Sequence, residues 1–199
     1  MQSLKDKFEE LRLKLGHGRR LDSTGTEPIF YLVFSTSDIL DVKRQTKAWI
    51  AKLSHDNWNV VTLSMAEAVE AVLKNHKLRK LSLQGEQKLL AHAEKTSTPV
   101  NFREINKSLS KALLEGDGLH KVIQQHLEAA EAQSHGLLLL TDLEALHPYL
   151  RINTIEAKLQ GRLHCPVVVL YPGKREGKTS LRFLEFYPAD PNYRSEHIG

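Results

Sequence analysis

The sequence predicts an α/β protein with a three-layer architecture, in which a mainly parallel sheet lies between two layers of helices. The first observation is the run of four leucines at 137–140. A strand made of leucines has no polar face and needs cover on both sides. The second is that strand, capped turn and helix follow one another twice within residues 29–74, as in a doubly wound sheet. Another apolar run at 166–170 predicts a further buried strand, so region 136–173 should form the centre of the core.

The composition is that of a folded chain, with 41% hydrophobic and 26% charged residues among 199. We expect a single domain over 1–199, with an N-terminal helix in 1–16, a helical insertion in 75–133 and the second half of the sheet and the tail in 134–199. No apolar run has the length of a membrane span, and the charged N-terminus argues against a signal peptide. Because Cys165 is the single cysteine, no intramolecular disulfide can form, which favours a cytoplasmic location. A net charge of +4 permits an acidic or nucleic-acid partner without requiring one.

The first part of the chain contains three amphipathic helix patterns and two buried-strand patterns. In the first helix, apolar residues recur every three or four positions, and we expect this helix to dock on the domain rather than to be offered to another protein. Residues 29–34 predict a strand, followed by a helix to about Leu53 that Ser37 or Asp38 can cap. Residues 59–63 predict a second strand, followed by a helix from Met65 to about Lys74 that Ser64 can cap.

Helical patterns fill most of residues 75–133, which is more than one crossover between parallel strands needs. We therefore predict an inserted helical hairpin or cap, with the loop 95–101 as its hinge. Further on, Asn153 and Glu156 have the spacing of a capping box, and Gly161 is expected to end that short helix. Residues 181–187 alternate apolar and polar side chains, as a half-exposed strand does. The tail from 188 is rich in proline and polar groups and is expected to be irregular.

Two segments resemble parts of a nucleotide-binding site. Gly173 to Thr179 resembles a phosphate-binding loop, but it has three rather than four residues between its glycines and precedes a strand rather than a helix, so a basic hairpin turn is favoured. The turn at 35–38 has neither glycine nor lysine. Leu137–Asp142 resembles the acidic motif that holds magnesium in NTPases. The prediction is a degenerate P-loop-like domain in which Asp142 caps the following turn, with no cofactor.

The remaining candidates for chemistry are histidines and carboxylates. His147 and His164 lack further ligands at the spacing of a zinc site, and His164 and Cys165 would point to opposite faces of a strand. The best acid/base or metal candidate combines Asp142, Glu144 and His147. A structural or surface role is favoured for all of them, and the sequence assigns no catalytic or metal-binding residue.

Four stretches carry a resemblance to a known family: 30–53, 106–119, 136–173 and 179–199. The strings LTDLEALHPYLR and FYPADPNYRS are the most unusual of these. The chain resembles the BrxB-type proteins of bacteriophage-exclusion (BREX) loci over nearly all residues after the first two dozen. The resemblance brings no catalytic residues with it. It implies a cytoplasmic component of an antiviral system that also contains an adenine-specific DNA methyltransferase, an AAA+ ATPase and a PglZ-type protein.

In that setting, a small protein without a catalytic motif is expected to be a scaffold or adaptor that binds other BREX proteins, with the PglZ-type protein as first choice. Tyrosine and arginine are favoured at protein interfaces, and they occur in the loop 142–151 and the tail 188–197. The predicted partner-binding residues are Asp142, Glu144, His147, Pro148, Tyr149, Arg151, Tyr193 and Arg194. The same tyrosines could instead pin these segments to the domain, and this alternative stays open.

Two other functions compete with the adaptor. A DNA-binding accessory subunit of the methylation or defence complex would place cations on phosphates, and its binding would fall steeply with salt. Its candidate residues are Arg19, Arg20, Lys174, Arg175 and Lys178. An enzyme would use Asp142 or Glu144.

Overall fold

A parallel sheet forms the centre of the protein, seen in a computed structural model that describes residues 2–17, 28–77, 79–159, 163–177, 179–190 and 195–199. Among these residues the sheet has six strands in the order β2-β3-β4-β1-β6, with β5 paired to β4. All neighbouring pairs are parallel except β4 and β5. The bounds are β1 Ile29–Phe34, β2 Asn59–Ser64, β3 Gly136–Thr141, β4 Val167–Glu176, β5 Ser180–Phe183 and β6 Glu196–Ile198. The predicted α/β class with a mainly parallel sheet is confirmed, whereas the likeness to a P-loop domain is not.

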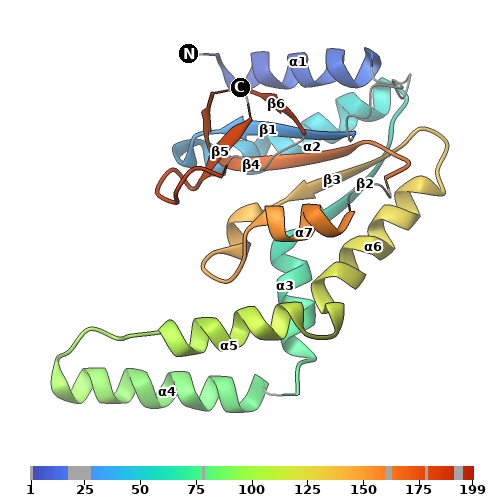
Figure 1. Cartoon of the computed structure of the whole chain (residues 1–199). Helices are drawn as coiled ribbons and strands as arrows, with labels where there is room; N and C mark the ends of the chain where they lie inside the picture. Colours follow the sequence, from blue (N-terminus) through green and yellow to red (C-terminus); the bar gives the residue numbers. More distant parts are fainter. Residues whose placement is uncertain (1, 18–27, 78, 160–162, 178, 191–194) are drawn as a thin grey trace.

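Helices cover both faces of this sheet (Figure 1). The helices α1 and α2 pack on one face, and α3, α6 and α7 pack on the other. Between β2 and β3 the chain also forms α4 and α5, which extend away from the sheet. The bounds are α1 Leu4–His17, α2 Ile39–His55, α3 Met65–Lys74, α4 Arg79–Thr96, α5 Arg103–Leu114, α6 Gly118–Glu131 and α7 Ile152–Leu159. Short 3-10 helices are η1 Thr36–Asp38, η2 Glu115–Asp117 and η3 Leu143–Leu146. Among the described residues, no helix combines the length and apolar character needed to span a bilayer.

The leucines of β3 divide between the two faces of the sheet. Leu137 and Leu139 belong to the cluster under α1 and α2, while Leu138 and Leu140 belong to the cluster with α3 and α6. All four are almost completely buried. Successive side chains of a strand alternate between faces, so an unbroken apolar run requires a layer on each side, as predicted.

The helix α1 is docked on the domain, as the sequence predicts. Phe8 stacks on Trp49 of α2 with ring centroids 4.8 Å apart, and the Lys7 ammonium donates a hydrogen bond of 2.9 Å to the carbonyl oxygen of Val33. At the start of the helix, the amide of Asp6 donates to the Ser3 hydroxyl and the Asp6 carboxylate accepts from the Ser3 amide. This reciprocal pair satisfies amide groups that a helix start leaves open.

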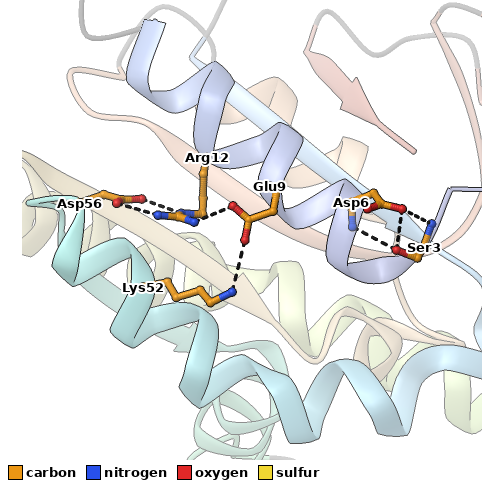
Figure 2. Close-up of polar contacts among 6 residues, drawn as sticks. All are labelled: Ser3, Asp6, Glu9, Arg12, Lys52 and Asp56. Atoms are coloured by element: carbon orange, nitrogen blue, oxygen red, sulfur yellow. Dashed lines mark hydrogen bonds and ion pairs between the residues drawn. The ribbon is translucent and has the colours of Figure 1, made fainter.

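A network of ion pairs adds to this docking (Figure 2). The Arg12 guanidinium donates to both carboxylate oxygens of Asp56, at 2.6 and 2.8 Å, and to Glu9 at 2.5 Å. Glu9 also accepts from the Lys52 ammonium at 3.2 Å. The two-point contact of Arg12 on Asp56 fixes the orientation of both groups, and it joins residues far apart in sequence.

Replacing Arg12 with alanine is expected to lower the free energy of unfolding by about 1 kcal/mol, because a partly buried two-point ion pair in a network is lost. The measurement is urea unfolding at low and high salt, and the difference should shrink in high salt. The matched control is Arg44→Ala, which removes the exposed pair with Asp41 on the outer face of α2 and should change little. Equal effects of the two substitutions would contradict the prediction.

Three local predictions at the C-terminal end of the chain are wrong. The tail is not wholly irregular, because Glu196–Ile198 form β6 beside β1. The strand predicted for 181–187 ends at Phe183, since Leu184 and Glu185 have left-handed backbone conformations (φ 50° and 62°). The hairpin turn predicted for 173–179 begins later than expected: β4 continues to Glu176, and the β4–β5 hairpin closes through Gly177. The hairpin itself is present, as predicted.

Two predicted caps are also wrong. Neither Ser37 nor Asp38 caps α2; the Ser35 hydroxyl instead accepts from the Ser37 amide in η1. The predicted capping box at Asn153 and Glu156 is not formed because α7 already begins at Ile152. Glu156 is buried and accepts a hydrogen bond of 2.6 Å from the Tyr31 hydroxyl. Gly161 lies outside the described residues. The cap at Ser64 is present, where the hydroxyl accepts from the Glu67 amide.

Candidate functional site

A pocket of about 280 Å³ lies between α2 and the sheet, near the carboxyl ends of β1 and β3. In open parallel sheets, ligands usually bind at the carboxyl ends of the strands. Apolar residues of the strands and of α2 form part of its wall, and lysines and carboxylates form the rest. The lining residues are Phe34, Ile39, Val42, Lys43, Thr46, Lys47, Thr141, Asp142, Glu144 and Leu170.

An ion cluster occupies one side of this pocket; we call Lys43, Ser64, Thr141, Asp142 and Glu144 the acid–lysine cluster. The Lys43 ammonium lies 2.8 Å from Asp142 and 2.7 Å from Glu144. The hydroxyls of Ser64 and Thr141 donate to the second carboxylate oxygen of Asp142 at 2.7 and 2.9 Å. Asp142 itself has a left-handed backbone (φ 53°), a conformation that aspartate and asparagine tolerate better than most residues.

The cluster sets the charge state of its own members. Burial acts to raise the pKa of Asp142, but hydrogen bonds from Lys43, Ser64 and Thr141 outweigh it and hold the pKa below its usual value. Hydrogen bonds to Asp142 and Glu144 in turn raise the pKa of Lys43. The stabilisation through Asp142 is present above its unfolded pKa of about 4 and is lost as pH falls through its folded pKa; that through Lys43 is lost only above about pH 10.5.

The role predicted for Asp142 needs correction. Asp142 precedes η3, yet its side chain makes no capping hydrogen bond to that helix; it accepts from Lys43, Ser64 and Thr141 instead. Lys43 was not among the residues predicted for the site. The sequence does contain a signal that could have paired Lys43 with Asp142. Lys43 lies near the start of the helix after β1, and Asp142 directly follows β3. The carboxyl ends of parallel strands lie at the same end of a sheet, so these two residues are expected to be close.

Replacing Asp142 with asparagine is expected to lower the free energy of unfolding by about 1 kcal/mol, because the ion pair is lost while the backbone preference is kept. The measurement is urea unfolding between pH 3 and 8. The deficit should be constant at neutral pH and shrink as pH falls below about 4 toward the lowered folded pKa of Asp142, where the wild-type carboxylate also becomes protonated. The exposed carboxylate Asp41 gives a matched control, Asp41→Asn. A deficit that persists in acid would contradict the assignment to charge.

A second feature lies where the loop after β3 meets the turn after β5; we call His147, Pro148, Arg151, Phe186 and Tyr187 the aromatic surface. The Nδ1 atom of His147 and the Tyr187 hydroxyl are hydrogen-bonded at 2.6 Å. The Arg151 guanidinium lies 4.5 Å from the centroid of the Tyr187 ring. Phe186 contacts both rings, with centroids 5.4 Å from His147 and 4.5 Å from Tyr187. The bond between His147 and Pro148 is cis.

Phe186 remains 62% exposed within this surface. The turn that presents it is held by Glu185, whose carboxylate accepts from the Ser35 hydroxyl at 2.8 Å and from the Thr36 amide at 2.9 Å. Of the predicted partner-binding residues, His147, Pro148 and Arg151 belong to the aromatic surface, and Asp142 and Glu144 to the acid–lysine cluster. Tyr149 is half-buried against the core. Tyr193 and Arg194 lie outside the described residues.

Phe186 was not among the predicted residues. Its position in an alternating pattern at 181–187 suggested a strand, and the left-handed residues before it give no strong sequence signal. Of the two tyrosines whose role was left open, Tyr149 packs on the domain, and Tyr193 lies outside the described residues.

The cations predicted to contact DNA are only partly described. Arg19, Arg20 and Lys178 lie outside the described residues. Lys174 is exposed on the β4–β5 hairpin. Arg175 donates to the carbonyl oxygens of Gly177 at 3.0 Å and of His197 at 3.3 Å, so its guanidinium holds the hairpin and β6.

Within the described part of the chain, neither the histidines nor Cys165 belongs to a metal-binding cluster. There, no group of three or more histidine, cysteine, aspartate or glutamate side chains lies close enough to hold a metal ion. Cys165 is buried, and burial raises the pKa of its thiol to about 11. A thiol with such a pKa is almost entirely protonated at neutral pH and is a poor nucleophile.

The fold and these features define an α/β protein that carries an ion-paired acid–lysine cluster at the carboxyl end of its sheet and an exposed aromatic surface in the same region. A family model described as BREX protein BrxB matches residues 75–198, more than half of the chain, and the chain belongs to this family. The resemblance inferred from the sequence is thereby confirmed. Neither the curated proteins nor the solved structures compared with the chain gave a match. Family membership makes the protein a component of a BREX antiviral defence system.

Proposed function

We propose that this protein is a non-catalytic adaptor that binds another BREX protein through the aromatic surface. The observation that carries the proposal is the exposed ring of Phe186, which is 62% accessible and is held between His147 and Tyr187. A rigid aromatic side chain loses little conformational entropy on binding, and aromatic residues and arginine are enriched at the centres of interfaces. Arg151, stacked on Tyr187, supplies a charged group at the same place.

The acid–lysine cluster supports a non-catalytic role. A general base must be poised to accept a proton near neutral pH, which requires a raised carboxylate pKa. The pKa of Asp142 is held below its usual value instead, and the neighbouring ammonium of Lys43 is bound to two carboxylates. The ion pairs of Lys43 stabilise the loop after β3. Asp142, Glu144 and His147 all belong to this loop, so the cluster also supports the aromatic surface.

The PglZ-type protein of the same locus is our first choice of partner, because a small protein without a catalytic motif in a BREX locus is expected to bind another protein of that locus. The experiment is pairwise co-expression of the chain with each other product of its locus, followed by co-purification. Failure to co-purify with any of them would count against the adaptor.

Replacing Phe186 with serine is expected to weaken the affinity for that partner by about tenfold or more, because the loss of a central aromatic contact costs more than about 1.4 kcal/mol. The measurement is isothermal titration calorimetry with the purified partner. Leu13→Ser on α1 is the matched control, since Leu13 is a similarly exposed apolar residue on a different element of the fold. Thermal unfolding should be nearly the same for both variants. Unchanged binding by Phe186→Ser would remove the aromatic surface from the proposal.

The alternative DNA-binding role has less support among the described residues, since Arg175 is already bonded to backbone oxygens. Duplex DNA in a gel-shift assay over a range of salt concentrations tests it. Retention that falls steeply with salt, and that charge reversal of Lys174 weakens, would favour it over the adaptor.

A further inference from the structure

The helices α4 and α5 form an arm that extends away from the sheet (Figure 1). We call residues 79–114 the arm. Within it, α5 packs on α3 and α6, while α4 packs mainly on α5. Of the 18 residues of α4, Ala93 alone is buried. A helix of this length that buries so little leaves most of its surface to solvent and gains little from tertiary packing.

The arm holds the whole charge excess of the protein. It contains seven lysine and arginine residues and three glutamates, so its net charge is +4. The full chain has 28 basic and 24 acidic residues and therefore also a net charge of +4. The rest of the chain is thus balanced. On α5, Arg103, Lys107 and Lys111 follow one another at intervals of four and are all exposed, which places them in one row along the helix.

The arm also carries exposed leucines. Leu83 and Leu90 are 47% and 46% exposed, and their separation of seven residues places them on the same side of α4, about two turns apart. Leu81 is 63% exposed at the beginning of α4, and Leu114 is 39% exposed at the end of α5. Leucines at such spacing match the apolar positions of an amphipathic helix bound alongside.

We propose that the arm is a second docking surface, and that it binds an acidic amphipathic helix of another BREX protein. The leucines would cover the apolar face of that helix, and the cations would face its carboxylates, which fixes orientation and speeds association. A second copy of this chain fits poorly, because it would bring one +4 arm against another. Duplex DNA would contact the cations and leave the exposed leucines unused. The proposal rests on the adaptor function and gives it a second attachment point, separate from the aromatic surface.

The experiment uses the full chain and each BREX protein that co-purifies with it. Two variants probe the arm: Leu83→Ser with Leu90→Ser, and Lys107→Glu with Lys111→Glu. All four positions are exposed, so circular dichroism and thermal unfolding should match the wild type. Each variant is expected to weaken the affinity for at least one partner by about tenfold or more in calorimetry. The wild-type affinity for that partner should fall as salt is raised. Leu13→Ser again serves as control.

The possible failures are distinguishable. If both arm variants bind every partner like the wild type while Phe186→Ser still weakens binding, the arm proposal is overturned and the adaptor function stands. If no BREX protein co-purifies with the wild type, both proposals fail. Loss of duplex DNA retention by the charge variant, with all protein affinities unchanged, would assign the arm to nucleic acid. A wild-type dimer in light scattering that the leucine variant dissolves, again with unchanged partner affinities, would assign it to self-association.

Discussion

Gly136→Ala is expected to lower the free energy of unfolding by about 3 kcal/mol, at the upper end of the usual cost of overpacking. Gly136 is the first residue of β3, and the chain reaches it through a tight turn from α6. A Cβ atom at this position would lie 1.8 Å from the carbonyl oxygen of Ala130 and 2.7 Å from its carbonyl carbon. Both are backbone atoms, so relieving the clash requires α6 to move relative to β3.

The matched control is Gly85→Ala in α4, where an added Cβ atom meets nothing within 4 Å. Alanine stabilises a helix relative to glycine by about 1 kcal/mol, so the same chemical change should have the opposite sign there. Urea or thermal unfolding of the two variants measures both effects. A Gly136→Ala variant as stable as the wild type would show that the turn between α6 and β3 can shift freely, contrary to the close contact described above.

The sequence predicts well those parts of the fold whose cause is local. The run at Leu137–Leu140 has no polar face, so its burial between two layers follows from the residues themselves. The helix from Met65 to Lys74 has a cap at Ser64 and a clear apolar stripe, and its observed bounds are those predicted. In each case propensity, capping and apolar pattern agree, which is the condition for a reliable prediction.

The parts that were missed depend on contacts between distant segments. The strand β6 has only three residues, and it exists because the edge of β1 offers hydrogen-bonding groups to whatever chain lies beside it. The pairing of Lys43 with Asp142 joins residues 99 positions apart. Glu156 has the spacing of a capping residue, but tertiary packing directs it to Tyr31. No local pattern reports such contacts, which is why the candidate site was only partly predicted.

His197 of β6 provides the second large expected effect, because it is a buried titratable group in a strand that the sequence did not reveal. Its side chain is buried, and its ring lies 5.6 Å from that of Tyr31, nearly perpendicular to it. Among the described groups that face it are Tyr31, the Ser195 hydroxyl at 3.3 Å from Nε2, and Arg175, which donates to its carbonyl oxygen. Burial, with a smaller contribution from the charge of Arg175, lowers the pKa of His197 to about 4.

Acidification from pH 6.5 to 4 is therefore expected to lower the free energy of unfolding by about 3 kcal/mol through His197 alone. The folded pKa of about 4 lies below the ordinary histidine value of 6.5, so in this interval the unfolded chain binds a proton that the native protein does not. Each unit of difference corresponds to about 1.4 kcal/mol. The stabilisation is complete above pH 6.5 and is lost as pH falls toward 4.

The measurement compares the pH dependence of urea unfolding for the wild type and His197→Phe, a variant that keeps an aromatic ring beside Tyr31 but cannot titrate. Any difference in packing shifts the variant curve by a constant amount, whereas the titration of His197 changes the slope between pH 4 and 6.5. The wild type should lose about 3 kcal/mol more than the variant across that interval. Parallel curves would mean that His197 takes up its proton in the native protein as readily as in the unfolded chain, and that β6 is not held closed against β1.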